Sequence, residues 1–172
     1  MPLIAINEAN PLTDGRQSEK ALTVQRVMIR HLEQAGHAVL AEFPLVSGRR
    51  ADLLSLDRKG RFTLIEIKSS VEDFRVDRKW PEYAAFCDCF AFATWHGVPV
   101  DIFPQSEGLF VTDGYQAEML REPGGEPMHA ASRKALTLRF ARLAARRAER
   151  VTRYAEANNL LGGLTGDDDG DL

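Results

Sequence analysis

Residues 49–70, RRADLLSLDRKGRFTLIEIKSS, restrict the fold more than any other stretch, because they predict two strands joined by a tight turn. Both faces of these strands carry apolar residues: Leu53, Leu54, Leu56, Phe62, Leu64, Ile65 and Ile67. Strands of this kind belong in the middle of a sheet that is covered on both sides. The loop at 58–60 ends in Gly60, and glycine readily takes the left-handed conformation of a three-residue hairpin loop. We therefore expect a hairpin at the centre of a covered sheet.

Three charged residues lie within this apolar hairpin: Asp52, Glu66 and Lys68. The loop sets Asp57 opposite Arg61, and counting along the ladder then sets Asp52 opposite Glu66. Opposed residues share a face, with Cβ atoms roughly 4.5–5.5 Å apart, and Lys68 falls on that face because it lies two residues beyond Glu66. Two carboxylates that face each other in an apolar sheet are unfavourable unless something compensates for their charge.

A divalent cation is one such compensation. Hard cations take oxygen ligands from one or two carboxylates and complete their shell with water and substrate phosphate. Lys68 would then place a positive charge beside the reacting phosphate. The alternative is a structural ion pair near a sheet edge, formed by Lys68 with Glu66 or with Asp52. The hairpin predicts either a metal-dependent phosphate site or a structural charge cluster.

The spacing between Asp52 and the run Glu66-Ile67-Lys68 resembles the motif of the PD-(D/E)XK, or restriction-endonuclease-like, nuclease superfamily. Ala51 stands where the superfamily's name has proline, which many members lack. A longer run, EIKSSVEDFRVDRKWPEY, resembles the MmcB-type family of bacterial DNA-repair proteins, as do CDCFAFAT, GLFVTD and RKALTLRFAR further on. The resemblance covers residues 18–154. It implies an α/β fold with a restriction-endonuclease-like core, in which helices flank a mixed central sheet and a long C-terminal helix follows.

The same resemblance implies roles for individual residues. Asp52 and Glu66 would hold Mg²⁺ or Mn²⁺, with the backbone carbonyl of Ile67 as a third oxygen ligand. Lys68 would position the attacking water or stabilise charge that develops on the phosphate in the transition state. Related nucleases bring a glutamate of the first helix toward the metal, and Glu19 occupies a similar place; compensation of the helix dipole is its alternative role.

The leading hypothesis is therefore a metal-dependent DNA nuclease, a deoxyribonuclease that hydrolyses phosphodiesters in DNA repair. The alternative is a catalytically silent module of the same fold that binds DNA or a repair partner. A third hypothesis is a scaffold that dimerises through the long C-terminal helix. The chain contains no glycine-rich phosphate loop, serine-nucleophile elbow or zinc-protease motif that would indicate competing chemistry.

Residues outside the hairpin are candidates for contact with DNA. Lys79, Trp80 and Tyr83 follow the predicted active-site strand, and the aromatic rings could stack on substrate or bond to it; core packing is the alternative for Trp80. A helix expected over 132–157 carries a stripe of arginines: Arg139, Arg142, Arg146, Arg150 and Arg153. The stripe could lie along a DNA backbone. The alternative is a solvated face on which Glu149 pairs with a neighbouring arginine, Arg146 or Arg153.

Three parts are expected along the chain: an irregular arm at 1–17, a single nuclease-like domain at 18–160 and an acidic, disordered tail at 161–172. Ser18 is expected to cap a helix that ends near Gly36. Ser70 is expected to cap a second helix that runs to about Lys79. Further strands are expected at 38–45, 89–94, 109–112 and 115–121.

Composition adds expectations about compartment and partners. No segment approaches the apolar length of a membrane span, and the N-terminus lacks the pattern of a secretory signal, so we expect a cytoplasmic protein that binds no membrane. Cys87 and Cys89 are the only cysteines, so reduced thiols are expected rather than zinc. The net charge of −3 neither supports nor excludes DNA, because the aspartates of the tail account for that excess. DNA and DNA-repair proteins are the expected partners, and a homodimer is expected by analogy with related nucleases.

Overall fold

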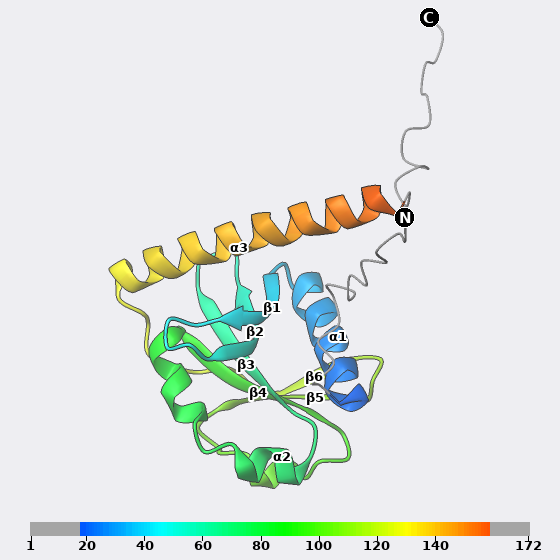
Figure 1. Ribbon diagram of the computed structural model, residues 1–172. Helices are drawn as coiled ribbons and strands as arrows, with labels where there is room; N and C mark the ends of the chain where they lie inside the picture. The colour runs from blue at the N-terminus through cyan, green and yellow to red at the C-terminus, as the bar shows by residue number, and fades with distance from the viewer. Residues whose placement is uncertain (1–17, 159–172) are drawn as a thin grey trace, which may run out of the picture. The chain divides into compact units, whose positions relative to one another are not determined.

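The computed structural model describes residues 18–158, which divide into two compact units. The first unit ends at Arg133, and the described part of the second begins at Lys134. The first is an α/β unit built on one six-stranded sheet (Figure 1). The described part of the second consists mostly of α3, the helix Ala130–Ala157, whose first four residues belong to the first unit. The predicted arm at 1–17 and tail at 161–172 lie outside the described residues, and a single domain over 18–160 stays a prediction.

The strands of the sheet follow one another in space in the same order as in the chain. They are β1 (Ala38–Pro44), β2 (Arg50–Leu56), β3 (Phe62–Lys68), β4 (Cys89–Trp95), β5 (Gly108–Thr112) and β6 (Ala117–Arg121). β3 pairs with β4 and β4 with β5 in parallel, whereas the other neighbours are antiparallel. Parallel neighbours need long crossover connections. The crossover from β3 to β4 carries α2 (Val71–Val76) and the 3₁₀ helix η1 (Trp80–Phe86), and the next carries η2 (Val100–Ile102).

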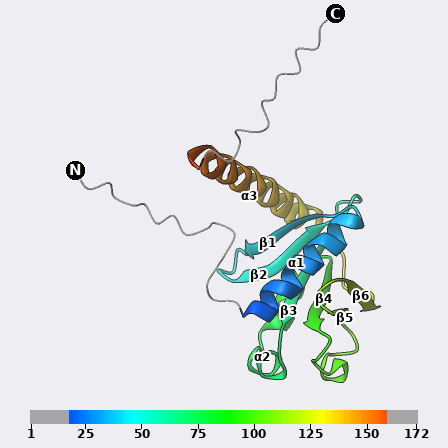
Figure 2. The ribbon, with the colours of Figure 1, turned by 90° about the vertical axis from the view of Figure 1, so that its right-hand side faces the viewer.

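One face of the sheet is covered by α1 (Glu19–Gln34), as Figure 2 shows. The helix begins where Ser18 accepts a hydrogen bond from the backbone of Ala21 at 3.1 Å, and Gly36 follows it in the left-handed conformation, with φ of 84°. Its apolar side packs on alternate residues of the central strands. This core cluster contains Val24, Met28, Leu32, Leu53, Ile65, Ile67, Ala91, Ala93 and Phe110. The covered hairpin expected from the sequence is therefore confirmed on this side.

Aromatic side chains cover the other face. β4 points Phe90 and Phe92 away from α1, because side chains alternate along a strand. Trp80 of η1 stacks on Phe90 with ring centroids 5.7 Å apart, and Phe74 of α2 meets Phe92 edge to face at 5.6 Å. The crossover between β3 and β4 thus packs onto the sheet instead of looping away from it.

One helix is shorter than expected. The helix capped by Ser70 ends at Val76 and not near Lys79, because Asp77 adopts an extended conformation. The Asp77 carboxylate accepts a hydrogen bond from the backbone N–H of Lys79 at 3.0 Å, a local bond that competes with continuation of the helix. None of the helices between residues 18 and 158 combines the length and the apolar character needed to cross a membrane.

Candidate active site

The β2–β3 hairpin has the register that its loop predicted. Leu56 pairs with Phe62 and Leu53 with Ile65, and the backbone N–H of Asp57 donates to the carbonyl of Arg61 at 3.0 Å. Gly60 takes the left-handed conformation, with φ of 80°. Continued by one residue, this register brings Asp52 opposite Glu66.

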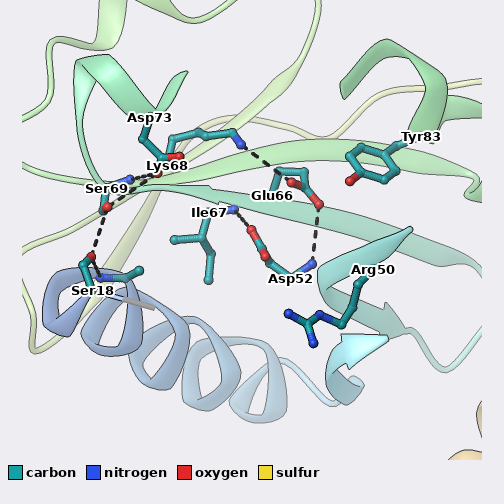
Figure 3. A pocket seen from close by; sticks show the side chains of 10 residues that line it. Ser18, Arg50, Asp52, Glu66, Ile67, Lys68, Ser69, Asp73 and Tyr83 are labelled. Carbon is teal, nitrogen blue, oxygen red and sulfur yellow. Dashed lines mark hydrogen bonds and ion pairs between the residues drawn. The ribbon is translucent and has the colours of Figure 1, made fainter. Parts of the chain in front are cut away.

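At Asp52 and Glu66, hydrogen bonds from backbone N–H groups to side-chain carboxylates replace the backbone hydrogen bonds between β2 and β3. The backbone N–H of Asp52 donates to Glu66 Oε1 at 3.4 Å, and that of Ile67 donates to Asp52 Oδ2 at 2.7 Å (Figure 3). The two strands therefore separate around a pair of carboxylates. Asp52, Glu66 and Lys68 line one pocket of about 440 Å³. The other lining residues come from α1 and its cap, β2, β3, the β3–α2 connection, α2 and η1: Ser18, Ala21, Arg50, Ile67, Ser69, Asp73 and Tyr83.

The pKa values of both carboxyl groups, Asp52 and Glu66, are raised. Burial raises the pKa of Asp52 from 3.8 to about 6, although the bond from Ile67 and the charge of Lys68 act to lower it. Burial also raises the pKa of Glu66, which is 4 % exposed, well above its ordinary value, and the charge of Asp52 adds to this effect. Among the described residues, the positive charge near Asp52 and Glu66 is therefore too small to bring their pKa values back to the ordinary range.

Lys68 is buried at the edge of the pocket with a carboxylate on each side. Its Nζ lies 2.6 Å from Asp77 Oδ2 and 3.8 Å from Glu66 Oε2. Burial acts to lower its pKa, but the hydrogen bond to Asp77 and the charge of Glu66 raise that pKa above its usual value. The ammonium group therefore stays charged. The alternative of a structural ion pair between Lys68 and Glu66 is supported in part, but the closest partner of Lys68 is Asp77.

The donor set suits a small, hard cation that keeps part of its water. Within residues 18–158 no three side chains of histidine, cysteine, aspartate or glutamate are grouped to hold a metal ion. A third ligand must then come from backbone, water or substrate. The N–H of Ile67 faces Asp52, and the N–H and C=O of one strand residue point to the same side, so its carbonyl faces Asp52 as well. The carbonyl of Lys68 points instead to β4, where it accepts a bond from Thr94 at 2.7 Å. Two carboxylates and one carbonyl fit Mg²⁺ or Mn²⁺, which bind few protein ligands.

Of the other candidate residues, Tyr83 lines the pocket, whereas Lys79, Trp80 and Glu19 do not. Tyr83 lines it and is 7 % exposed, and burial together with the charge of Glu66 raises its pKa to about 12. Trp80 packs on Phe90 and Phe92, so the core-packing alternative describes its position. Lys79 is exposed and its carbonyl accepts a bond from Arg49. Glu19 is exposed in the first turn of α1 and does not line the pocket, whereas its neighbour Ser18 does.

The arginine stripe lies on α3, in the second unit. Arg142, Arg146 and Arg150 are exposed and Arg139 is partly buried. Glu149 pairs with Arg153 at 2.8 Å, one of the two local pairs that the spacing predicted. Contact between this stripe and DNA stays a prediction.

Two residues of the site were missed because they depend on contacts outside the hairpin. Asp77 reaches Lys68 only because α2 ends at Val76. Glu42 lies opposite Asp52 in the register of β1 with β2, between the pairs Ala41–Leu53 and Phe43–Ala51, and its charge raises the pKa of Asp52 further. In the sequence, Asp77 could be noticed only as a polar residue just after a short helix. Nothing in the sequence pointed to Glu42, because its place beside Asp52 depends on the register of β1 with β2.

Fold and site together define an α/β protein with a mixed six-stranded sheet, a long C-terminal helix and a pocket that holds two carboxylates and a lysine. Residues 8–155 match the family described as DNA repair protein MmcB-like, and the chain therefore belongs to the MmcB-like family. A solved structure, the SPO1766 protein of unknown function from Silicibacter pomeroyi, is 34 % identical and superposes with a TM-score of 0.74. That alignment covers 79 % of this chain and 93 % of the other. No curated protein matches the chain.

Proposed function

We propose that the protein is a metal-dependent DNA nuclease that hydrolyses phosphodiester bonds in DNA repair, with a restriction-endonuclease-like core of the PD-(D/E)XK superfamily. The family's description as DNA repair proteins supports a role in DNA repair. The observation that carries the chemistry is the convergence of Asp52, Glu66 and Lys68 on one pocket. Two facing carboxylates, one buried (Glu66) and one half-buried (Asp52), are unfavourable for stability, so their presence is best explained by a ligand that neutralises them.

In this proposal each residue has a defined task. Asp52, Glu66 and the carbonyl of Ile67 would hold Mg²⁺ or Mn²⁺. The bound ion would polarise the phosphate and lower the pKa of a bound water. Lys68, kept charged by Asp77 and Glu66, faces the phosphate and stabilises the negative charge that grows there in the transition state. Tyr83 forms a wall of the pocket and limits how the nucleotide is seated. A contribution of Glu19 to catalysis stays a prediction.

DNA would also be bound outside the pocket. Lys79, which precedes η1, and the α3 arginines Arg139, Arg142, Arg146 and Arg150 are the proposed backbone contacts, because cations add affinity without sequence preference. Trp80, the first residue of η1, is proposed to stack on the DNA or to bond to it. DNA-repair proteins are proposed as partners, and a homodimer as the assembled state.

One observation favours a second function. The closest partner of Lys68 is Asp77 and not a group that lines the pocket, and the pKa values of Asp52 and Glu66 are both raised. A cluster of this kind is also expected in a catalytically silent module that binds DNA or a repair protein without turnover.

Cleavage assays on single-stranded, nicked, branched and duplex DNA with Mn²⁺ or Mg²⁺ test the proposal. We expect the wild type to cut at least one substrate and Lys68→Ala to lose that activity. Lys59→Ala, which changes an exposed lysine in the hairpin loop, is the matched control and should cleave like the wild type. If wild type and Lys68→Ala behave alike on every substrate, the nuclease proposal is wrong and the silent module is favoured.

A further inference from the structure

The pocket has a second basic group, Arg50, the first residue of β2. Residues two apart in a strand point to the same face, so Arg50 and Asp52 share a face. Arg50 lines the pocket with the two carboxylates, and Figure 3 draws its side chain beneath Asp52. The side chain is 46 % exposed, so a ligand that reaches Asp52 can reach Arg50 too.

Arg50 is paired across the strands with Glu42 of β1. The Nε of Arg50 donates to the Glu42 carboxylate. Glu42 is the only non-glycine residue between 18 and 158 with a positive φ, at 51°. A left-handed backbone is disfavoured for residues that carry a Cβ. A glycine at this position would avoid that cost but would have no carboxylate for Arg50.

Stability does not explain this arrangement. An ion pair whose arginine is half exposed adds little to the free energy of unfolding, because water competes for both charges. A strained residue beside a pocket is more often kept for what it positions. Here it positions a guanidinium group, whose five N–H donors can bond to a carboxylate and a phosphate at the same time.

The two basic groups of the pocket are held from opposite sides of the carboxylate pair. Lys68 on β3 is held by Asp77, from the crossover toward β4, and Arg50 on β2 is held by Glu42, from β1. A ligand bound over Asp52 and Glu66 would therefore have Lys68 on one side and Arg50 on the other.

We propose that Arg50 is a substrate-binding residue for a DNA phosphate adjacent to the scissile one, and that Glu42 is its positioning residue. This inference rests on the proposed function, because it takes DNA as the ligand of the pocket.

The test measures binding of a fluorescein-labelled single-stranded oligonucleotide by anisotropy, with chelator present so that no turnover occurs, over a series of salt concentrations. Arg50→Gln should weaken binding roughly five- to tenfold and reduce the salt-dependence slope by about 0.7, because one phosphate contact is lost. Arg61→Gln is the matched control: it removes the same charge from the other end of the hairpin, where Arg61 is also paired with a carboxylate. We expect its affinity and slope to equal those of the wild type.

Glu42→Gly separates positioning from folding. The glycine relieves the left-handed strain, so the melting temperature should stay the same or rise while affinity falls toward that of Arg50→Gln. A lower melting temperature with unchanged affinity would show a purely structural role and overturn the inference.

The outcomes distinguish this inference from the proposed function. If the wild type cleaves DNA but Arg50→Gln binds like Arg61→Gln, the inference fails and the nuclease stands. If Arg50→Gln shows the loss but no metal supports cleavage, Arg50 binds phosphate in a silent module. If the wild type neither binds nor cleaves DNA, both fail.

Discussion

At the turn end of the β2–β3 hairpin Asp57 faces Arg61, with their side chains 3.0 Å apart, whereas at the other end Asp52 faces Glu66. One register produces both pairs. Burial acts to raise the pKa of Asp57, but bonds from the backbone and side chain of Arg61 lower it overall. Burial raises the pKa of Asp52 to about 6, and no comparable set of donors lowers it.

The two ends differ in the sign of their facing charges and in the burial of their side chains. At the turn end Arg61 is exposed and Asp57 is half-buried, and the two carry opposite charges, which is what a hairpin needs for stability alone. At the pocket end Glu66 is buried and Asp52 is half-buried, and the two carry like charges, which reduce stability in the absence of a ligand. The same substitution, aspartate to asparagine, can therefore be made at both ends with opposite expected results.

The largest expected effect is on cleavage. If the proposed function is correct, Asp52→Asn and Glu66→Gln should each reduce the rate about a thousandfold or more, because each would remove a charged ligand of the bound metal. Asp57→Asn should leave the rate unchanged. Cleavage measured under single-turnover conditions checks this, and a rate for Asp52→Asn close to that of Asp57→Asn would remove the distinction between the two ends.

The next effect is on stability, in chelator. The folded pKa of Asp52 lies above its unfolded value, so the wild type should lose stability as pH rises from about 4 to about 6 and then stay level. A rise from 3.8 to about 6 corresponds to about 3 kcal/mol. Asp52→Asn cannot ionise, so at pH 7 it should be up to about 3 kcal/mol more stable than the wild type, with the difference fading toward pH 4. Urea unfolding at several pH values measures it, and a less stable Asp52→Asn at pH 7 would contradict the pKa argument.

Much of this contrast could be predicted from the sequence, because it is set by local features. Gly60 and the apolar residues around it determine the loop and the register, and the register determines which charges face each other. The first residues of α1 and α2 could be predicted for the same reason, because each helix is capped locally. Ser18 and Ser70 each accept a hydrogen bond from a backbone N–H three residues further on.

What could not be predicted depends on contacts between distant segments. The bond between Asp77 and Lys68 requires α2 to end early and its end to pack against β3. The place of Glu42 requires the register of β1 with β2 and a left-handed residue that no local pattern indicates. Trp80 could be assigned to the core only once Phe90 was known to lie beneath it.

A third effect should appear on adding metal. An ion that binds only the folded state stabilises it by about 2.7 kcal/mol at one hundred times its Kd, which for a chain of this length raises the melting temperature by about 5–10 °C. We expect this shift for the wild type with Mn²⁺ or Mg²⁺, and for Asp57→Asn to the same extent. Asp52→Asn should show little of it. Equal shifts in all three proteins would mean that the ion binds elsewhere.

The smallest effect is expected at the turn end, and it has the opposite sign. Asp57→Asn keeps an oxygen that can accept from the backbone N–H groups of Lys59 and Arg61 but loses the ion pair with the Arg61 side chain. Since an exposed pair contributes little, we expect a loss of about 0.5 kcal/mol at pH 7. The folded pKa of Asp57 is lowered, so its stabilisation is present above about pH 4 and is lost as pH falls through that lower value. Urea unfolding of Asp57→Asn at pH 7 and pH 3 measures both points, with Lys59→Ala as a control in the same loop. A gain in stability at pH 7, as expected for Asp52→Asn, would show that burial does not separate the two ends of the hairpin.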